Sequence, residues 1–230
     1  MLILALETST DAGSCALWCD GAISERRCPT GRPHSETLLP LVRELLGDAD
    51  VRIDQLDAIA FGMGPGAFTG LRVACGAAQG LAVASNRPLI PISSLETVAA
   101  MSGADQVLAV LDARMGEIYA GCYVADAGAW VLRGDIRVSA PEAVMLPETS
   151  GWLASGNALA VYPALTRRLE VAGIGIGPAS VPDAVAVVRL AADRMARGEK
   201  GIDAALAAPL YVRDKVAKTV AERLREGGRA

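Results

Sequence analysis

Several residue patterns that mark common protein classes are absent from this 230-residue sequence. It has one histidine, His34, and its five cysteines form no CxxC pair, so we expect neither a zinc site nor another metal site. No GxSxG motif supports serine hydrolysis. No stretch approaches the roughly 18 unbroken apolar residues of a membrane span, and the start MLILALETST lacks the basic leader of a secretory signal.

Charge and composition narrow the class further. The formal net charge is −4, and an acidic chain is poorly suited to bind a nucleic acid alone. An odd number of cysteines without paired spacing is typical of reduced thiols that pack as small hydrophobic residues in the cytosol. Apolar residues make up 52% of the chain but aromatic residues only 4%, so small and aliphatic side chains must build the core. We therefore expect a cytoplasmic protein with no membrane association.

The first half of the chain alternates strand-like and helix-like segments. Apolar or alternating runs bounded by turn residues predict strands at 2–6, 14–19, 22–27, 56–61 and 88–92. Asp20-Gly21 is a strong hairpin signal, so the second and third strands should pair antiparallel. Apolar stripes predict helices at 34–46 and 68–85, and a third helix should begin near Ser93. This alternation predicts an α/β protein.

The second half begins with a segment that resembles the N-terminus. Residues 107–123, VLAVLDARMGEIYAGCY, again form an apolar run that ends in an acid, Asp112 in place of Glu7, followed by a polar turn and a second strand. An aromatic residue, Trp18 or Tyr123, follows each acid at the same distance. We infer two lobes built on one plan, at 1–103 and 104–230. A chance likeness between two hairpins is the alternative.

The remainder of the second half is less clearly patterned. It predicts a helix start at Ser139, a strand at 152–154, a helix at 182–196 and a charged C-terminal helix at 212–225. Apolar residues four apart in that last helix should pack one stripe against a lobe, and we expect it to return to the first lobe.

A glycine-rich loop, GMGPGAFTGLR at 62–72, resembles a phosphate cradle at first sight. A P-loop needs lysine and then serine or threonine after its last glycine, but Gly70 is followed by Leu71 and Arg72. The dinucleotide pattern GxGxxG also fails, because Gly70 comes one place too late after Gly64 and Gly66. We predict a tight strand-to-helix turn whose glycines let backbones approach closely. An anion at the helix N-terminus remains the alternative.

The helix after this loop carries no charge between Arg72 and Arg87. Its interior glycines, Gly76 and Gly80, each cost roughly 1 kcal/mol relative to alanine, which a close approach by another backbone would offset. Together with the apolar stripe at 34–46, this predicts a partner surface on the first lobe. An ordinary buried helix is the alternative. The predicted surface comprises His34, Leu38, Leu41, Val42, Leu45, Phe68, Thr69, Arg72, Gly76 and Gly80.

Polar residues at the ends of the two equivalent strands are the only candidates for cofactor chemistry. They are Glu7, Thr8, Ser9 and Asp112. Acids at such positions can hold Mg²⁺ against a nucleotide, but they more often cap turns. We therefore predict no catalytic residue and no cofactor that this chain requires by itself.

Three segments together resemble one protein family. GMGPGAFTGLRVACGAAQGLA, LDARMGEIY and PLYVRDKVAKT are similar to signature segments of the bacterial TsaB (YeaZ) proteins, and LILALETSTDAGSCALW and HSETLLP fit in order and spacing. The resemblance spans nearly the whole chain, although 125–208 is poorly marked. One departure is Glu7, where the family usually has aspartate, and this weakens the case for nucleotide or metal chemistry there.

The resemblance implies an actin-like, sugar-kinase-like fold with two lobes, each with a mixed sheet flanked by helices. It implies a non-catalytic scaffold that pairs with TsaD and TsaE for threonylcarbamoyl transfer to the adenosine beside the anticodon of tRNAs reading ANN codons. ATP and a divalent metal would belong to the partners, tRNA would bind only through the assembly, and the isolated chain would form a homodimer. The rival hypotheses are an autonomous ATPase or small-molecule kinase using Mg-ATP between the lobes, and a peptidase.

Overall fold

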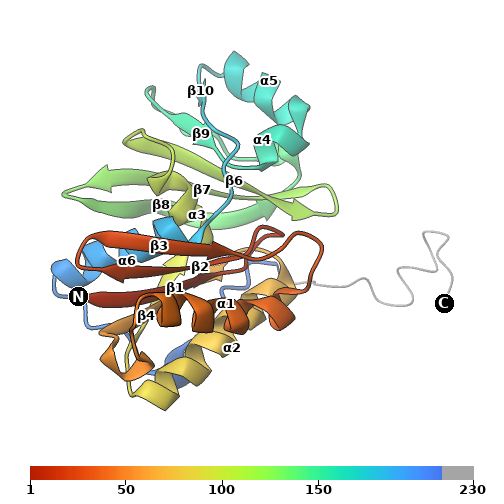
Figure 1. Ribbon diagram of the computed structural model, residues 1–230. Helices are drawn as coiled ribbons and strands as arrows, with labels where there is room; N and C mark the ends of the chain where they lie inside the picture. Colours follow the sequence, from red (N-terminus) through yellow and green to blue (C-terminus); the bar gives the residue numbers. More distant parts are fainter. Residues whose placement is uncertain (214–230) are drawn as a thin grey trace, which may run out of the picture.

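The computed structural model describes residues 1–213 and contains two lobes, each built around a five-stranded sheet (Figure 1). The first sheet has the strand order β3-β2-β1-β4-β5, and the second has the order β10-β9-β6-β7-β8. In each sheet the first three strands form an antiparallel meander, and the last two add in parallel beside the first. The two sheets share one topology, which confirms the predicted duplication.

The elements have the following bounds. The first sheet contains β1 (Leu2–Glu7), β2 (Ser14–Cys19), β3 (Ala22–Arg27), β4 (Ala58–Gly64) and β5 (Leu89–Ser93). The second contains β6 (Gln106–Arg114), β7 (Glu117–Asp126), β8 (Ala129–Ser139), β9 (Leu153–Ser155) and β10 (Gly175–Ile176). The helices are α1 (His34–Asp48), α2 (Phe68–Ser85), α3 (Ser94–Ala100), α4 (Ala158–Val161), α5 (Pro163–Val171) and α6 (Ala184–Ala196). Short 3-10 turns cover Ile53–Gln55, Pro141–Ala143 and Ala204–Leu206.

Helices α1 and α2 cover the outer face of the first sheet, and α4 and α5 lie beyond the second sheet at the opposite end of the molecule (Figure 1). Alternation along β1 explains this layering, because successive side chains point to opposite faces. Leu4 and Leu6 pack with α1 and α2, whereas Ile3 and Ala5 pack with α6.

The helix that follows each sheet packs on the sheet of the other lobe. Helix α3 follows β5, but its Leu95 and Val98 pack with Val107 of β6. Helix α6 follows β10, but its Val187 and Val188 pack on the first sheet. The predicted division at 104–230 is therefore wrong for 184–196, since apolar periodicity shows that a helix has a buried face without showing which sheet covers it.

A partly buried ion pair joins the two crossing helices. Arg194 of α6 donates from Nη2 to both carboxylate oxygens of Glu96 on α3, at 2.9 and 2.6 Å, and from Nη1 to the carbonyl of Pro91. Burial raises the pKa of Glu96, and the guanidinium of Arg194 opposes that shift. The pair therefore fixes the two lobes where their helices meet.

The weakly patterned region differs most from expectation. The helix expected near Ser139 is a single 3-10 turn at Pro141–Ala143, and helix α5 and strand β8 were not predicted. Helix α5 buries only Leu165 and Leu169, which is too short a stripe to recognise from sequence. The predicted helix at 212–225 lies outside the described residues, apart from its first two positions.

Candidate functional site

The glycines of the 62–72 loop make room for the turn between β1 and β2. A Cβ atom added to Gly62 would lie 1.9 Å from Glu7 Oε2, one on Gly66 would lie 2.4 Å from the Ser9 carbonyl oxygen, and one on Gly70 would lie 1.8 Å from the Thr8 carbonyl oxygen. Real Cβ atoms essentially never approach so closely. The glycine loop therefore packs directly against the backbone of the β1–β2 turn in the same lobe. This confirms the predicted close approach.

Hydrogen bonds also join the 62–72 loop to the β1–β2 turn. Thr8 Oγ1 donates to the Gly70 carbonyl at 2.7 Å, and the Ala67 amide donates to the Ser9 carbonyl at 2.7 Å. The Ser9 amide donates to Glu7 Oε1 at 2.5 Å, and Glu7 Oε2 has no partner among the described residues. Burial raises the pKa of Glu7 against the opposing effect of its hydrogen bonds with Ser9. Glu7 and Thr8 therefore hold the turn together from inside the core.

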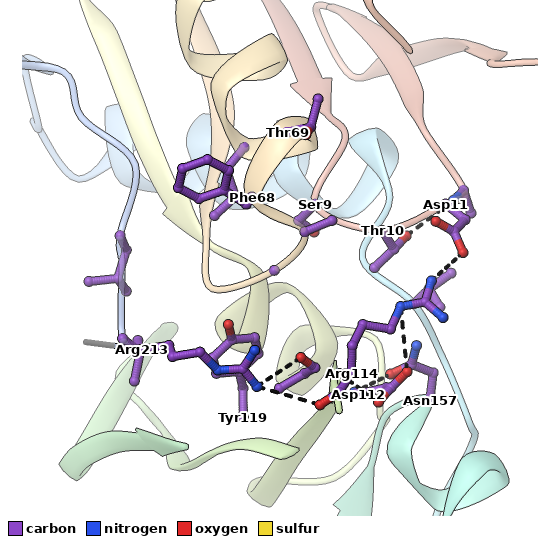
Figure 2. Close-up of a pocket in the computed structure, with 18 of the residues that line it drawn as sticks. Ser9, Thr10, Asp11, Phe68, Thr69, Asp112, Arg114, Tyr119, Asn157 and Arg213 are labelled. Atoms are coloured by element: carbon purple, nitrogen blue, oxygen red, sulfur yellow. Dashed lines mark hydrogen bonds and ion pairs between the residues drawn. The ribbon is translucent and has the colours of Figure 1, made fainter. Parts of the chain in front are cut away.

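A cleft of about 530 Å³ lies between the lobes (Figure 2). Its walls come from the β1–β2 turn, the start of α2, the β6–β7 turn and residues 210–213. Of the four residues predicted to hold a cofactor, Ser9 and Asp112 line this cleft, but Glu7 and Thr8 do not. The sequence could place all four near strand ends, but only the packing against Gly62 and Gly70 shows that two of them point away.

Asp112 is engaged in holding the β6–β7 turn. Its Oδ1 accepts from Tyr162 Oη at 2.8 Å and from the Arg114 amide at 2.9 Å, and its side chain is 10% exposed. Burial and the bond to Asp112 raise the pKa of Tyr162 to about 12. Among residues 1–213, no group of three or more His, Cys, Asp or Glu side chains is arranged to hold a metal. The carboxylate of Asp112 therefore serves the β6–β7 turn within its own lobe.

Two arginines tie the β6–β7 turn to other parts of the molecule. Arg114, Met115 and Gly116 all have positive φ, and the Arg114 guanidinium reaches across the cleft to Asp11 Oδ2 at 2.5 Å. Arg213 donates to the Ala113 carbonyl at 3.1 Å and to Glu117. Both arginines belong to motifs noted in the sequence, but their contacts could not be predicted, because each partner lies about a hundred residues away.

The outer face of α2 is open in this single chain. Gly76 and Gly80 are exposed, and a Cβ atom on either would meet nothing within 4 Å. Val83 is 73% exposed, and Thr69 and Arg72 are also exposed. The opposite face packs into the core through Ala74, Cys75, Ala78 and Ala82. The alternative of an ordinary buried helix does not describe the single chain, because one face packs on the sheet and the other has no cover among the described residues.

Helix α1 contributes less to the outer surface than predicted. Leu38, Val42 and Leu45 are at most 2% exposed because they pack on the first sheet. Their assignment to the partner surface is therefore wrong. The prediction that these residues form one apolar face of a helix is confirmed, but that face packs on the sheet of its own lobe. Leu41 is half-buried, and His34 is half-buried with its Nε2 2.9 Å from the Thr10 carbonyl oxygen. The residue that sequence analysis missed is Leu39, which is 48% exposed.

The stretch 201–213, which we call the returning segment, runs along the first lobe. Its Ile202 pairs with the edge strand residue Leu89, and the Leu210 amide donates to the Met63 carbonyl at 2.7 Å. Tyr211 then lies beside the start of α2, and Arg213 reaches the β6–β7 turn. The described parts of the three segments that carry the family resemblance therefore line one cleft.

None of the helices within residues 1–213 has the length and apolar character needed to cross a bilayer.

Comparisons with known proteins agree with the motifs. Residues 29–220 match the protein family described as "TsaD: tRNA N6-adenosine threonylcarbamoyltransferase". The chain is 36% identical over 227 residues to the tRNA threonylcarbamoyladenosine biosynthesis protein TsaB of Escherichia coli, covering 94% of this chain and 96% of that one. It is 43% identical to the TsaB protein of Haemophilus influenzae over 123 residues, which is 52% of each chain.

Solved structures support the same assignment. The structure described as YeaZ from Pseudomonas aeruginosa superposes with a TM-score of 0.80 at 38% identity, covering 91% of this chain and 99% of that one. Together with the duplicated sheets, this match confirms two lobes of the actin-like ATPase type. The chain therefore belongs to the TsaB (YeaZ) family of tRNA threonylcarbamoyladenosine biosynthesis proteins.

Proposed function

We propose that this chain serves threonylcarbamoyladenosine formation as a non-catalytic subunit that pairs with a TsaD-like protein through the outer face of α2. The observation that carries the proposal is this open helical face, where Gly76 and Gly80 lie exposed in the helix interior. Glycine in a helix costs roughly 1 kcal/mol relative to alanine, and neither position needs glycine for a contact with any other of residues 1–213. Close approach by a second protein would account for both.

The cleft supports a role without catalysis. The carboxylate of Asp112 accepts hydrogen bonds from Tyr162 Oη and the Arg114 amide. The carboxylate of Glu7 is buried and does not line the cleft. ATP and a divalent metal would then act on the partner subunits, and tRNA would be bound by the whole assembly. We further propose that the isolated chain forms a homodimer through the same face, that a TsaE-like protein completes the assembly, and that it works in the cytoplasm.

Mass measurement of the chain alone and mixed with its cognate TsaD-like protein tests the pairing. We expect a homodimer alone and a heterodimer in the mixture. Gly76→Leu should weaken both, because the new side chain projects from the exposed face, while the fold keeps its stability. Ala164→Leu places the same side chain on an exposed position of α5 in the other lobe, so it should leave pairing unchanged.

Two results would overturn the proposal. The first is a Gly76→Leu variant that pairs as tightly as the parent chain. The second is micromolar binding and hydrolysis of Mg-ATP by the isolated chain, measured by calorimetry and phosphate release and lost in Asp112→Asn, which changes a residue that lines the cleft. That second result would favour the autonomous ATPase instead.

A further inference from the structure

The start of α2 holds an arginine over one aromatic ring and beside a second. The Arg72 guanidinium carbon lies 3.5 Å from the centroid of the Phe68 ring and 5.6 Å from that of the Tyr211 ring. Arg72 Nε donates to Tyr211 Oη at 3.0 Å, and the two rings are 5.6 Å apart. Because a guanidinium stacks on aromatic faces, this arrangement fixes its plane and direction before any partner binds.

The Nη1 and Nη2 atoms of this guanidinium are available to bind another molecule. No hydrogen bond or ion pair joins Nη1 or Nη2 of Arg72 to another of residues 1–213, and the side chain is exposed. Phe68 and Tyr211 are themselves 37% and 47% exposed. A planar guanidinium with two outward nitrogens matches the geometry of a carboxylate, which it binds with two parallel hydrogen bonds.

The surroundings favour a protein ligand. Arg72 is the one charged residue of α2, and the rest of the exposed face is small or apolar through Gly76, Gly80 and Val83. An arginine with aromatic neighbours beside a larger neutral surface has the composition of an interface hot spot. A small anion would use the guanidinium but would leave that apolar surface uncovered.

We propose that Arg72, held by Phe68 and Tyr211, binds an aspartate or glutamate side chain of the TsaD-like partner. This inference rests on the proposed function, because it names the chemistry by which the α2 face recognises its partner. It also assigns Tyr211 of the returning segment a positioning role: its hydroxyl accepts from Nε and leaves the Nη atoms facing outward. The returning segment thereby becomes part of the interface.

Calorimetric titration of the TsaD-like protein into variants of the full chain tests this. Arg72→Lys keeps the charge but loses the planar fork, so we expect affinity to fall about tenfold or more. Tyr211→Phe keeps the ring and loses the hydroxyl, so we expect a smaller loss. Arg167→Lys, on an exposed position of α5, is the matched control and should bind like the parent chain. Thermal midpoints of all three should match the parent, since the side chains are exposed.

Salt dependence separates a carboxylate contact from simple packing. The affinity of the parent chain should fall as salt rises, and Arg72→Gln should bind more weakly with a flatter dependence on salt. Affinity unchanged in Arg72→Lys while Gly76→Leu still abolishes pairing would overturn the inference and leave the proposed function standing. Weaker binding by Arg72→Gln with an unchanged salt dependence would refute the carboxylate. Pairing that neither Arg72→Lys nor Gly76→Leu disturbs would overturn both.

Discussion

The same substitution at two glycines of one helix should change stability in opposite directions. Gly70 and Gly76 both lie in α2, and neither has a positive φ, so alanine suits the backbone at both positions. They differ in surroundings. The added Cβ at Gly70 would lie 1.8 Å from the Thr8 carbonyl oxygen, whereas at Gly76 it would meet nothing within 4 Å. The pair therefore isolates the effect of tertiary contact from that of helix propensity.

The expected magnitudes follow from these distances. At Gly70 the turn must retreat by about 1.2 Å, the gap between 1.8 Å and the 3.0 Å below which real Cβ contacts are essentially absent. Overpacking of this kind costs about 1–3 kcal/mol, and loss of the buried bond from Thr8 Oγ1 to the Gly70 carbonyl adds about 1–3 kcal/mol. At Gly76 alanine should stabilise the helix by about 0.5–1 kcal/mol, because it lowers the backbone entropy lost on folding.

Urea titration and thermal unfolding measure both effects, at a protein concentration where the chain is monomeric so that pairing does not contribute. For a chain of this size 1 kcal/mol corresponds to about 2–4 °C, so Gly70→Ala should lower the melting temperature by roughly 4–24 °C and Gly76→Ala should raise it by roughly 1–4 °C. Equal destabilisation by both would show that Gly76 is packed. A neutral Gly70→Ala would refute the account of the glycine loop as a seat for the β1–β2 turn.

Three further predictions concern buried and bridging charges. Because burial raises the pKa of Glu7 above its ordinary 4.5, its ionisation destabilises the fold as pH rises; Glu7→Gln should therefore be more stable than the parent near pH 7, and the advantage should vanish as pH falls toward 4.5 in urea titrations. Arg194→Ala should cost about 3–5 kcal/mol of unfolding free energy, since it leaves the carboxylate of Glu96 buried without its partner, and Glu96→Gln in the same chain should recover part of that loss. Arg213→Ala should increase hydrogen exchange in the β6–β7 turn, whereas Arg114→Ala, whose ion pair with Asp11 is exposed, should change unfolding free energy by less than about 1 kcal/mol.

Local sequence patterns were sufficient to predict most elements of the first lobe and the duplication. Strand and helix periods are local properties, so the runs at 2–6, 14–19 and 68–85 appear in the structure with bounds close to those predicted. The repeated order of apolar strand, acid and turn was visible for the same reason, and the second sheet bears it out. Between 125 and 208 the elements are short and weakly amphipathic, and there the prediction missed α5 and β8.

Tertiary structure decided what each recognised segment touches. An apolar stripe shows that a face is covered but gives no sign of what covers it, so Leu38, Val42 and Leu45 were assigned to a partner although they pack on their own sheet. The exposed face of α2 could be anticipated from its uncharged, glycine-containing sequence. The stack of Arg72 with Tyr211 could not, because it joins residues 139 positions apart.

The sequence by itself determined most secondary structure of the first lobe, the repeated plan of the two lobes and the family, since each depends on the order of neighbouring residues. Only the tertiary structure showed that the glycine loop packs against Thr8 and Ser9 and that Glu7 points away from the cleft. It also showed that α3 and α6 each pack on the sheet of the other lobe. The physical reason is the range of the interactions. Helix and strand periods act over a few residues, whereas steric exclusion at Gly70 and burial of α6 depend on which distant segments the fold brings together.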